Sequence, residues 1–181
     1  MRKLVHKFLR LIGWNISLWH PEEIKKAVVV MGPHTSNWDF VLGRLAFYMM
    51  GLKGRYLVKK DIFVFPLGFI LKGLGAIPVD RSKNNNMVDN VAKLFKESER
   101  LYVVFTPEGT RSYNPNWKKG FYYLAIKAEV PIILAYVDFP TKKGGFLEVF
   151  HPTGDVDADI QSIKQKLGQF KGKYPEKGII L

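Results

Sequence analysis

Hydrophobic and polar positions along the chain fall into two kinds of pattern. Short segments rich in apolar and β-branched residues predict strands over residues 27–31, 55–59, 76–79, 101–105, 130–137 and 146–150. Longer segments with helical spacing of apolar residues lie between them, over residues 40–50, 87–99, 121–129 and 158–170. Strands that alternate with helices through short connections predict one α/β domain, a three-layer sandwich with a largely parallel central sheet.

The N-terminal residues form a distinct basic segment. We expect residues 1–20 to hold an amphipathic helix over Met1 to Leu18, followed by a single domain over residues 21–181. Such a helix either lies in a membrane interface or packs on the core of its own domain. No apolar stretch reaches the roughly 18 residues of a spanning helix, and no cleavage signal follows the basic start, so we expect neither a transmembrane segment nor a signal peptide.

A second apolar segment, Ile62 to Leu71, carries no charge and contains Phe63, Phe65 and Phe69. It is too short to span a bilayer. A core helix, an interfacial segment and the wall of an acyl-binding groove all fit this pattern.

Polar clusters follow three of the predicted strands. They are residues 34–39, 80–81 and 108–112. Ligands of parallel α/β sheets gather at the carboxyl ends of the strands, so we expect the three clusters to form one site.

His34 and Asp39 carry the candidate chemistry of the first cluster. An imidazole at the end of a strand can act as a general base, and a carboxylate can hold its tautomer. Positions five apart point about 140° away from each other on a helix, so the two side chains can meet if His34 lies in the turn and Asp39 in the first helical turn. Ser36 with Asp39 also fits a capping box, which is the structural alternative.

Arg81 and Arg111 are candidate phosphate ligands in the other two clusters. A guanidinium group binds phosphate oxygens through two parallel hydrogen bonds. The alternative is an ordinary ion pair, with Asp80 beside Arg81 and Glu108 beside Arg111.

The charge of the chain limits the classes of binding partner that we expect. The chain has 28 Lys and Arg against 16 Asp and Glu, a net charge of +12, which favours an anionic partner: nucleic acid, an anionic membrane or a phosphorylated substrate.

Several kinds of catalytic or binding site can be excluded. The chain has no cysteine, which excludes thiolate catalysis and thiolate metal sites. The 4 histidines lack paired metal-ligand spacing, so no metal is expected. Neither a nucleotide-binding glycine motif nor a Gly-x-Ser-x-Gly elbow is complete.

Four blocks in order resemble the motifs of the glycerolipid acyltransferases, most closely the 1-acylglycerol-3-phosphate (lysophosphatidate) acyltransferases. They are residues 34–39 with His-x-x-x-x-Asp, 75–81, 105–112 with Phe-Thr-Pro-Glu-Gly-Thr-Arg-Ser, and 130–133. The resemblance covers roughly residues 27–140. Two positions depart from it: Leu134 replaces the usual second proline of the fourth block, and Pro33 precedes the histidine where many members carry asparagine.

The resemblance implies a glycerolphosphate-acyltransferase-like fold and transfer of a fatty acyl group from acyl-CoA or acyl-carrier protein to a lysophospholipid hydroxyl. His34 would be the general base and Asp39 would orient it. The acceptor site would consist of Arg81, Glu108, Gly109, Thr110 and Arg111. The acyl or donor side would be shaped by Val130 and Pro131.

The partners expected on this basis are the acyl thioester, the lysophospholipid and an anionic membrane surface. The acyl thioester is a co-substrate, and no cofactor is expected besides it. We expect peripheral attachment at the cytoplasmic face. Another lyso-acceptor, such as an amino-acid lipid, stays open. A basic nucleic-acid-binding domain is the alternative from another class, but the aromatic residues lie in apolar segments and do not alternate with Lys and Arg as a stacking surface requires.

Overall fold

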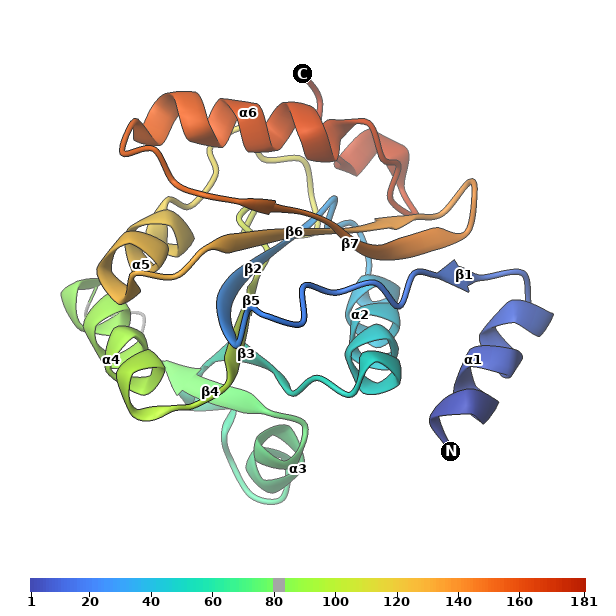
Figure 1. Cartoon of the computed structure of the whole chain (residues 1–181), viewed down its shortest axis with the longest axis horizontal. Coiled ribbons are helices and arrows are strands. Elements are labelled where there is room, and N and C mark those ends of the chain that lie inside the picture. Colours follow the sequence, from blue (N-terminus) through green and yellow to red (C-terminus); the bar gives the residue numbers. More distant parts are fainter. Residues whose placement is uncertain (80–83) are drawn as a thin grey trace.

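The computed structural model describes residues 1–79 and 84–181, and it builds them around one seven-stranded sheet (Figure 1). The strand order is β1-β7-β6-β2-β5-β3-β4. The strands are β1 (Asn15–Ile16), β2 (Lys26–Gly32), β3 (Gly54–Lys59), β4 (Ala76–Val79), β5 (Leu101–Phe105), β6 (Ile132–Asp138) and β7 (Lys143–Phe150). Every pairing is parallel except that of β6 with β7, which is antiparallel. The predicted α/β class with a largely parallel sheet is confirmed.

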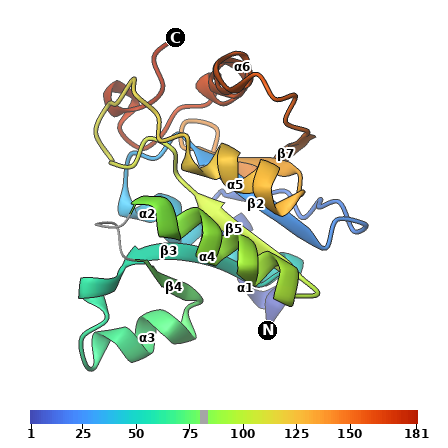
Figure 2. The same ribbon diagram turned by 90° about the vertical axis from the view of Figure 1, so that its left-hand side faces the viewer.

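Helices cover both faces of the sheet. They are α1 (Arg2–Leu11), α2 (Asn37–Met50), α3 (Leu67–Gly73), α4 (Asn84–Glu97), α5 (Gly120–Ala128) and α6 (Val156–Gly168), with the short turns η1 (Lys60–Ile62) and η2 (Pro175–Lys177). One face packs against α4, α5 and α6, and the other against α2 and α1. Helix α3 lies beyond the edge strand β4 (Figures 1 and 2).

Strand β2 lies in the middle of the sheet and supplies both core layers. Its apolar run is buried on both faces because the sheet is covered on both sides. Val28 and Val30 point toward α4, α5 and α6, whereas Val29 and Met31 point toward α2. The strand therefore fixes the position of the residues that directly follow it, from Pro33 onward.

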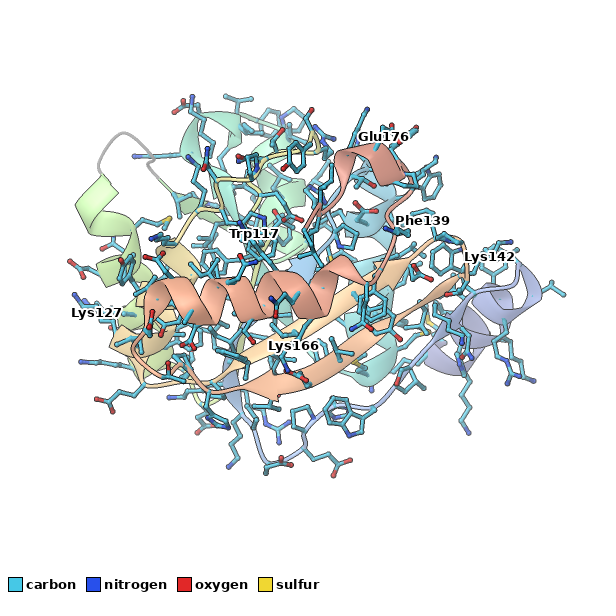
Figure 3. All side chains as sticks on the ribbon, turned by 90° about the horizontal axis from the view of Figure 1, so that it is seen from above. Trp117, Lys127, Phe139, Lys142, Lys166 and Glu176 are labelled. Carbon is cyan, nitrogen blue, oxygen red and sulfur yellow. The ribbon has the colours of Figure 1, made fainter. Side chains whose placement is uncertain are left out.

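The N-terminal helix is shorter than predicted. It ends at Leu11, and Asn15–Ile16 then pair with β7 in parallel. The Lys142 Nζ donates a hydrogen bond to the Ile12 carbonyl at 3.1 Å, beyond the end of the helix (Figure 3). Leu9 is buried against α2, whereas Leu4, Phe8 and Leu11 are exposed, so the helix has one face on the domain and another free.

The apolar segment after β3 is not a core helix. It forms η1, a connecting loop and α3, and within α3 only Gly68 is buried. In the part of the chain that the structure describes, none of the helices has the length and apolar character needed to cross a membrane.

Candidate active site

The candidate site lies at the carboxyl ends of β2 and β5, which are parallel neighbours. Val30 of β2 is opposite Phe105 of β5, so the residues that follow each strand leave the same edge of the sheet. This arrangement brings the cluster around His34 together with the cluster around Glu108, as the sequence predicts for a parallel sheet.

His34 and Asp39 form the centre of the site. The Nδ1 of His34 lies 3.2 Å from Oδ2 of Asp39, an ion-pair distance without the alignment of a hydrogen bond. The Asp39 side chain is fully buried, and that of His34 is 18% exposed although its Nδ1 is buried. The imidazole therefore has one nitrogen against a fixed carboxylate and keeps part of its ring accessible. A neutral imidazole with its proton on Nδ1 offers Nε2 as the basic atom.

Asp39 also holds the loop that carries His34. Its Oδ2 accepts hydrogen bonds from the backbone N–H groups of Thr35 at 2.7 Å and Ser36 at 2.8 Å, and its Oδ1 accepts one from the Ser36 hydroxyl at 3.0 Å. Ser36 is the N-cap of α2 and accepts a hydrogen bond from the Trp38 N–H. The capping box is therefore present together with the histidine contact, and one carboxylate performs both tasks.

Glu108 holds His34 through the backbone of the histidine. Its Oε1 accepts the backbone N–H of His34 at 3.0 Å, and its Oε2 has no hydrogen-bond partner. Burial raises the pKa of the Glu108 carboxyl, the bonds it accepts from backbone N–H groups partly offset this, and the nearby Asp39 charge raises the pKa further. The structure thus places the Glu108 carboxyl against the backbone of the loop that carries His34.

The residues that follow Glu108 extend toward the surface. Gly109 has a φ of +67°, a left-handed conformation that favours glycine, and it turns the chain outward. Thr110 and Arg111 are exposed, and the Arg111 guanidinium donates a hydrogen bond to the Asn37 side chain in the first turn of α2. Among the described residues, Arg111 forms no ion pair with Glu108. Its charge lies beside the His34 loop.

Sequence reasoning missed a segment near the C-terminal end that packs on the same loop. Gly172 lies against Thr35, and the Tyr174 N–H donates to the Thr35 hydroxyl at 3.3 Å. Lys173 Nζ lies 5.7 Å from the centre of the Trp38 ring. The adjoining η2 turn, marked by Glu176 in Figure 3, follows this segment beyond α6. The only sequence signal for this contact is Gly172, a residue that permits close approach, and nothing in the sequence connects it with Thr35.

Two predicted residues are not brought to this centre. Val130 and Pro131 precede β6, which runs parallel to β2, so they lie at the opposite edge of the sheet. Val130 is buried in the core, and the Pro131 carbonyl accepts the Val28 N–H at 3.1 Å, six residues before His34. Arg81 lies outside the described residues.

The site has the chemistry of a general base with buried supporting carboxylates. No group of three or more potential metal-ligating side chains occurs within residues 1–79 and 84–181. His34 can take a proton, Asp39 can stabilise the resulting imidazolium, and Arg111 can attract an anion to the same edge.

Comparison with known proteins identifies the class. The acyltransferase family model matches residues 15–137, so the chain belongs to the acyltransferase family. Family membership implies an acyl donor and an acceptor as substrates, and it favours the acyltransferase interpretation over the nucleic-acid-binding alternative.

Individual relatives refine the comparison. The chain is 28% identical to human 1-acyl-sn-glycerol-3-phosphate acyltransferase beta over 88% of its length, and 30% identical to an uncharacterized acyltransferase of Schizosaccharomyces pombe over 71%. It spans 64% and 45% of the lengths of these relatives. Its fold matches the crystal structure of the 1-acyl-sn-glycerophosphate (LPA) acyltransferase PlsC from Thermotoga maritima with a TM-score of 0.61 and 16% identity, over 93% of this chain and 78% of that one.

The raised pKa of Glu108 makes its contribution to stability dependent on pH. Below the ordinary glutamate pKa of 4.5 the carboxyl is protonated in both the folded and the unfolded protein. As pH rises, the carboxyl of the unfolded protein ionises first, which lowers the free energy of the unfolded state and so destabilises the fold. We therefore expect the free energy of unfolding of the wild type, minus that of Glu108→Gln, to fall as pH rises from 4.5. Urea denaturation of both proteins between pH 4 and 8 measures this difference. A difference that is constant or rises with pH contradicts the prediction.

The contact between Gly172 and Thr35 leaves no room for a side chain. A Cβ on residue 172 would lie 2.3 Å from the Thr35 hydroxyl oxygen, so Gly172→Ala must displace the segment or the His34 loop. We expect a loss of about 1–3 kcal/mol of stability. Gly73→Ala is the matched control for stability, because nothing lies within 4 Å of its added Cβ. Equal melting temperatures for the two variants would show that the contact is unimportant.

Proposed function

We propose that this protein transfers a fatty acyl group from an acyl thioester to the hydroxyl of a lysophospholipid, with 1-acylglycerol-3-phosphate as the first candidate acceptor. The observation that supports it most is the pairing of His34 with the buried Asp39 at the carboxyl edge of the sheet, with Arg111 beside the same loop. Acyl-CoA and acyl-carrier protein are both suitable donors.

His34 provides the proposed chemical step. Its Nε2 takes the proton of the acceptor hydroxyl while the hydroxyl oxygen attacks the thioester carbonyl. The carbon–sulfur bond then breaks, and the leaving thiolate recovers the proton from the imidazolium. No covalent enzyme intermediate is needed, in agreement with a chain that has no cysteine. Asp39 stabilises the imidazolium and keeps Nε2 available as the base.

Other residues of the site position His34 or bind the acceptor phosphate in this proposal. Glu108 acts on His34 through the backbone N–H and so positions the histidine, which is a different role from contact with the acceptor. The exposed Arg111 guanidinium, held by Asn37, is the group that we assign to the acceptor phosphate. Gly109 and Thr110 shape the turn that presents this arginine, and Arg81 is assigned to the same phosphate by its motif alone.

Attachment to a membrane belongs to the same proposal, since a lysolipid acceptor resides in a bilayer. Helix α1 carries Arg2, Lys3, Lys7 and Arg10 together with an exposed apolar face. Each basic residue near an anionic leaflet contributes roughly 1 kcal/mol. We propose peripheral binding at the cytoplasmic leaflet, weakened by salt.

The direct test is an assay of the purified protein with labelled acyl-CoA or acyl-carrier protein and a panel of lysolipids. We expect transfer to 1-acylglycerol-3-phosphate, and we expect His34→Ala to reduce kcat/KM about 10²–10⁴-fold, the usual contribution of a general base. His151→Ala, at an exposed histidine outside the site, is the matched control and should keep full activity.

Two results would overturn the proposal. An active His34→Ala protein would remove the base from the mechanism. Transfer to an amino-acid lipid or another lyso-acceptor, without transfer to 1-acylglycerol-3-phosphate, would keep the mechanism and reject the acceptor.

A further inference from the structure

A continuous segment of the described chain, residues 60–74, exposes many apolar side chains and comprises η1, the connecting loop and α3. We call it the 60–74 segment. Phe65 is 91% exposed and Phe69 is 82% exposed. Their exposed apolar neighbours in the segment are Ile62, Val64, Leu67, Ile70 and Leu74. Apolar exposure concentrated in so few residues marks an interaction surface.

The segment holds its own shape without a large core contact. The Gly68 N–H donates to the Val64 carbonyl at 2.7 Å, and a Cβ on Gly68 would lie 2.8 Å from the Phe63 carbonyl oxygen. The helix therefore folds tightly back on the preceding loop through its glycine. This packing leaves Phe65 and Phe69 directed away from the protein.

Basic residues flank the apolar surface. Lys60 begins the segment and Lys72 lies near its end, and both are exposed. Its single acidic residue, Asp61, is paired with Lys59 at 2.6 Å. An apolar centre flanked by positive charge complements the interface of an anionic bilayer, where aromatic rings enter the headgroup region and lysines meet lipid phosphates.

The topology places the start of this segment at the carboxyl end of β3, on the side of the sheet that carries the candidate site, and its end at the amino end of β4. Strands β2 and β3 are both parallel to β5, so their carboxyl ends point the same way. β2 leads to His34, and β3 leads directly to η1, two strand positions or roughly 10 Å along the sheet. Figure 2 shows η1 on the same side of the molecule as the loop that enters α2.

We propose that the 60–74 segment inserts into the interface of an anionic membrane, with Phe65 and Phe69 as its anchors, and so holds the His34 edge against the bilayer. The choice of a membrane as the partner rests on the proposed function, whose acceptor is a lipid, as well as on the charges of the segment. It assigns membrane contact to a surface separate from α1.

The absence of cysteine allows a site-specific test in the full chain. Single variants F65C, F69C and I126C are each labelled with the fluorophore NBD and mixed with vesicles of phosphatidylcholine and phosphatidylglycerol, without substrate. Ile126 is the matched control, an exposed apolar residue on α5 (48% exposed). We expect a blue shift and several-fold brightening at positions 65 and 69, quenched by spin-labelled lipid, and no change at 126.

A second measurement quantifies the contribution. The double variant Phe65→Ser with Phe69→Ser should partition into these vesicles at least about tenfold more weakly, since burying one phenylalanine changes an equilibrium by about that factor. The control pair is Tyr123→Ser with Ile126→Ser, which removes two exposed apolar side chains from α5 and should bind like the wild type. Both replaced phenylalanines are exposed, so folding is preserved.

The outcomes separate this inference from the proposed function. Labels at 65 and 69 that stay in water while the protein binds vesicles, or unchanged partition of the double variant, overturn the inference. A response that follows protein concentration without lipid shows contact between copies and also overturns it. Insertion by a protein that acylates no lysolipid supports the inference and rejects the proposed function alone.

Discussion

The buried carboxylate of Asp39 is the interaction on which the candidate site depends. It accepts three hydrogen bonds from Thr35 and Ser36, and it faces the His34 ring at ion-pair distance. The same group therefore caps the start of α2, fixes the loop before it and contacts the ring of His34, the proposed base. A fully buried charge is costly unless it is compensated in this way. Asp39 therefore couples the conformation of the loop, the start of α2 and the position of His34.

The sheet supplies the second constraint. The parallel pairing of β2 with β5 makes two loops that are distant in sequence leave one edge together, and Glu108 then joins them through the His34 N–H. His34 is consequently held by two carboxylates of different kinds, one at its ring and one at its backbone. Burial gives the second carboxyl its raised pKa and makes it a rigid support for the loop.

Much of this could be predicted from the sequence because the signals are local. The apolar run of β2, the Ser36–Asp39 cap and the strand-end position of Glu108 all depend on neighbouring residues. What could not be predicted depends on distant packing: the hydrogen bond from His34 to Glu108, the seating of Gly172 on Thr35, and the pairing of Asn15–Ile16 with β7, which shortens the first helix. The role implied by resemblance for Val130 and Pro131 has no counterpart at this edge, because β6 begins where β2 begins.

The shared direction of β2 and β3 has a kinetic meaning. On the proposed function and the proposed membrane contact, an enzyme seated on a bilayer by the loop after β3 would meet its acceptor within the plane of the membrane, at the end of β2. Its turnover would then follow the mole fraction of acceptor in that surface, whereas the amount dissolved in water would have little influence. A lipid product would leave by lateral diffusion, and successive reactions would take place without release of the protein from the membrane.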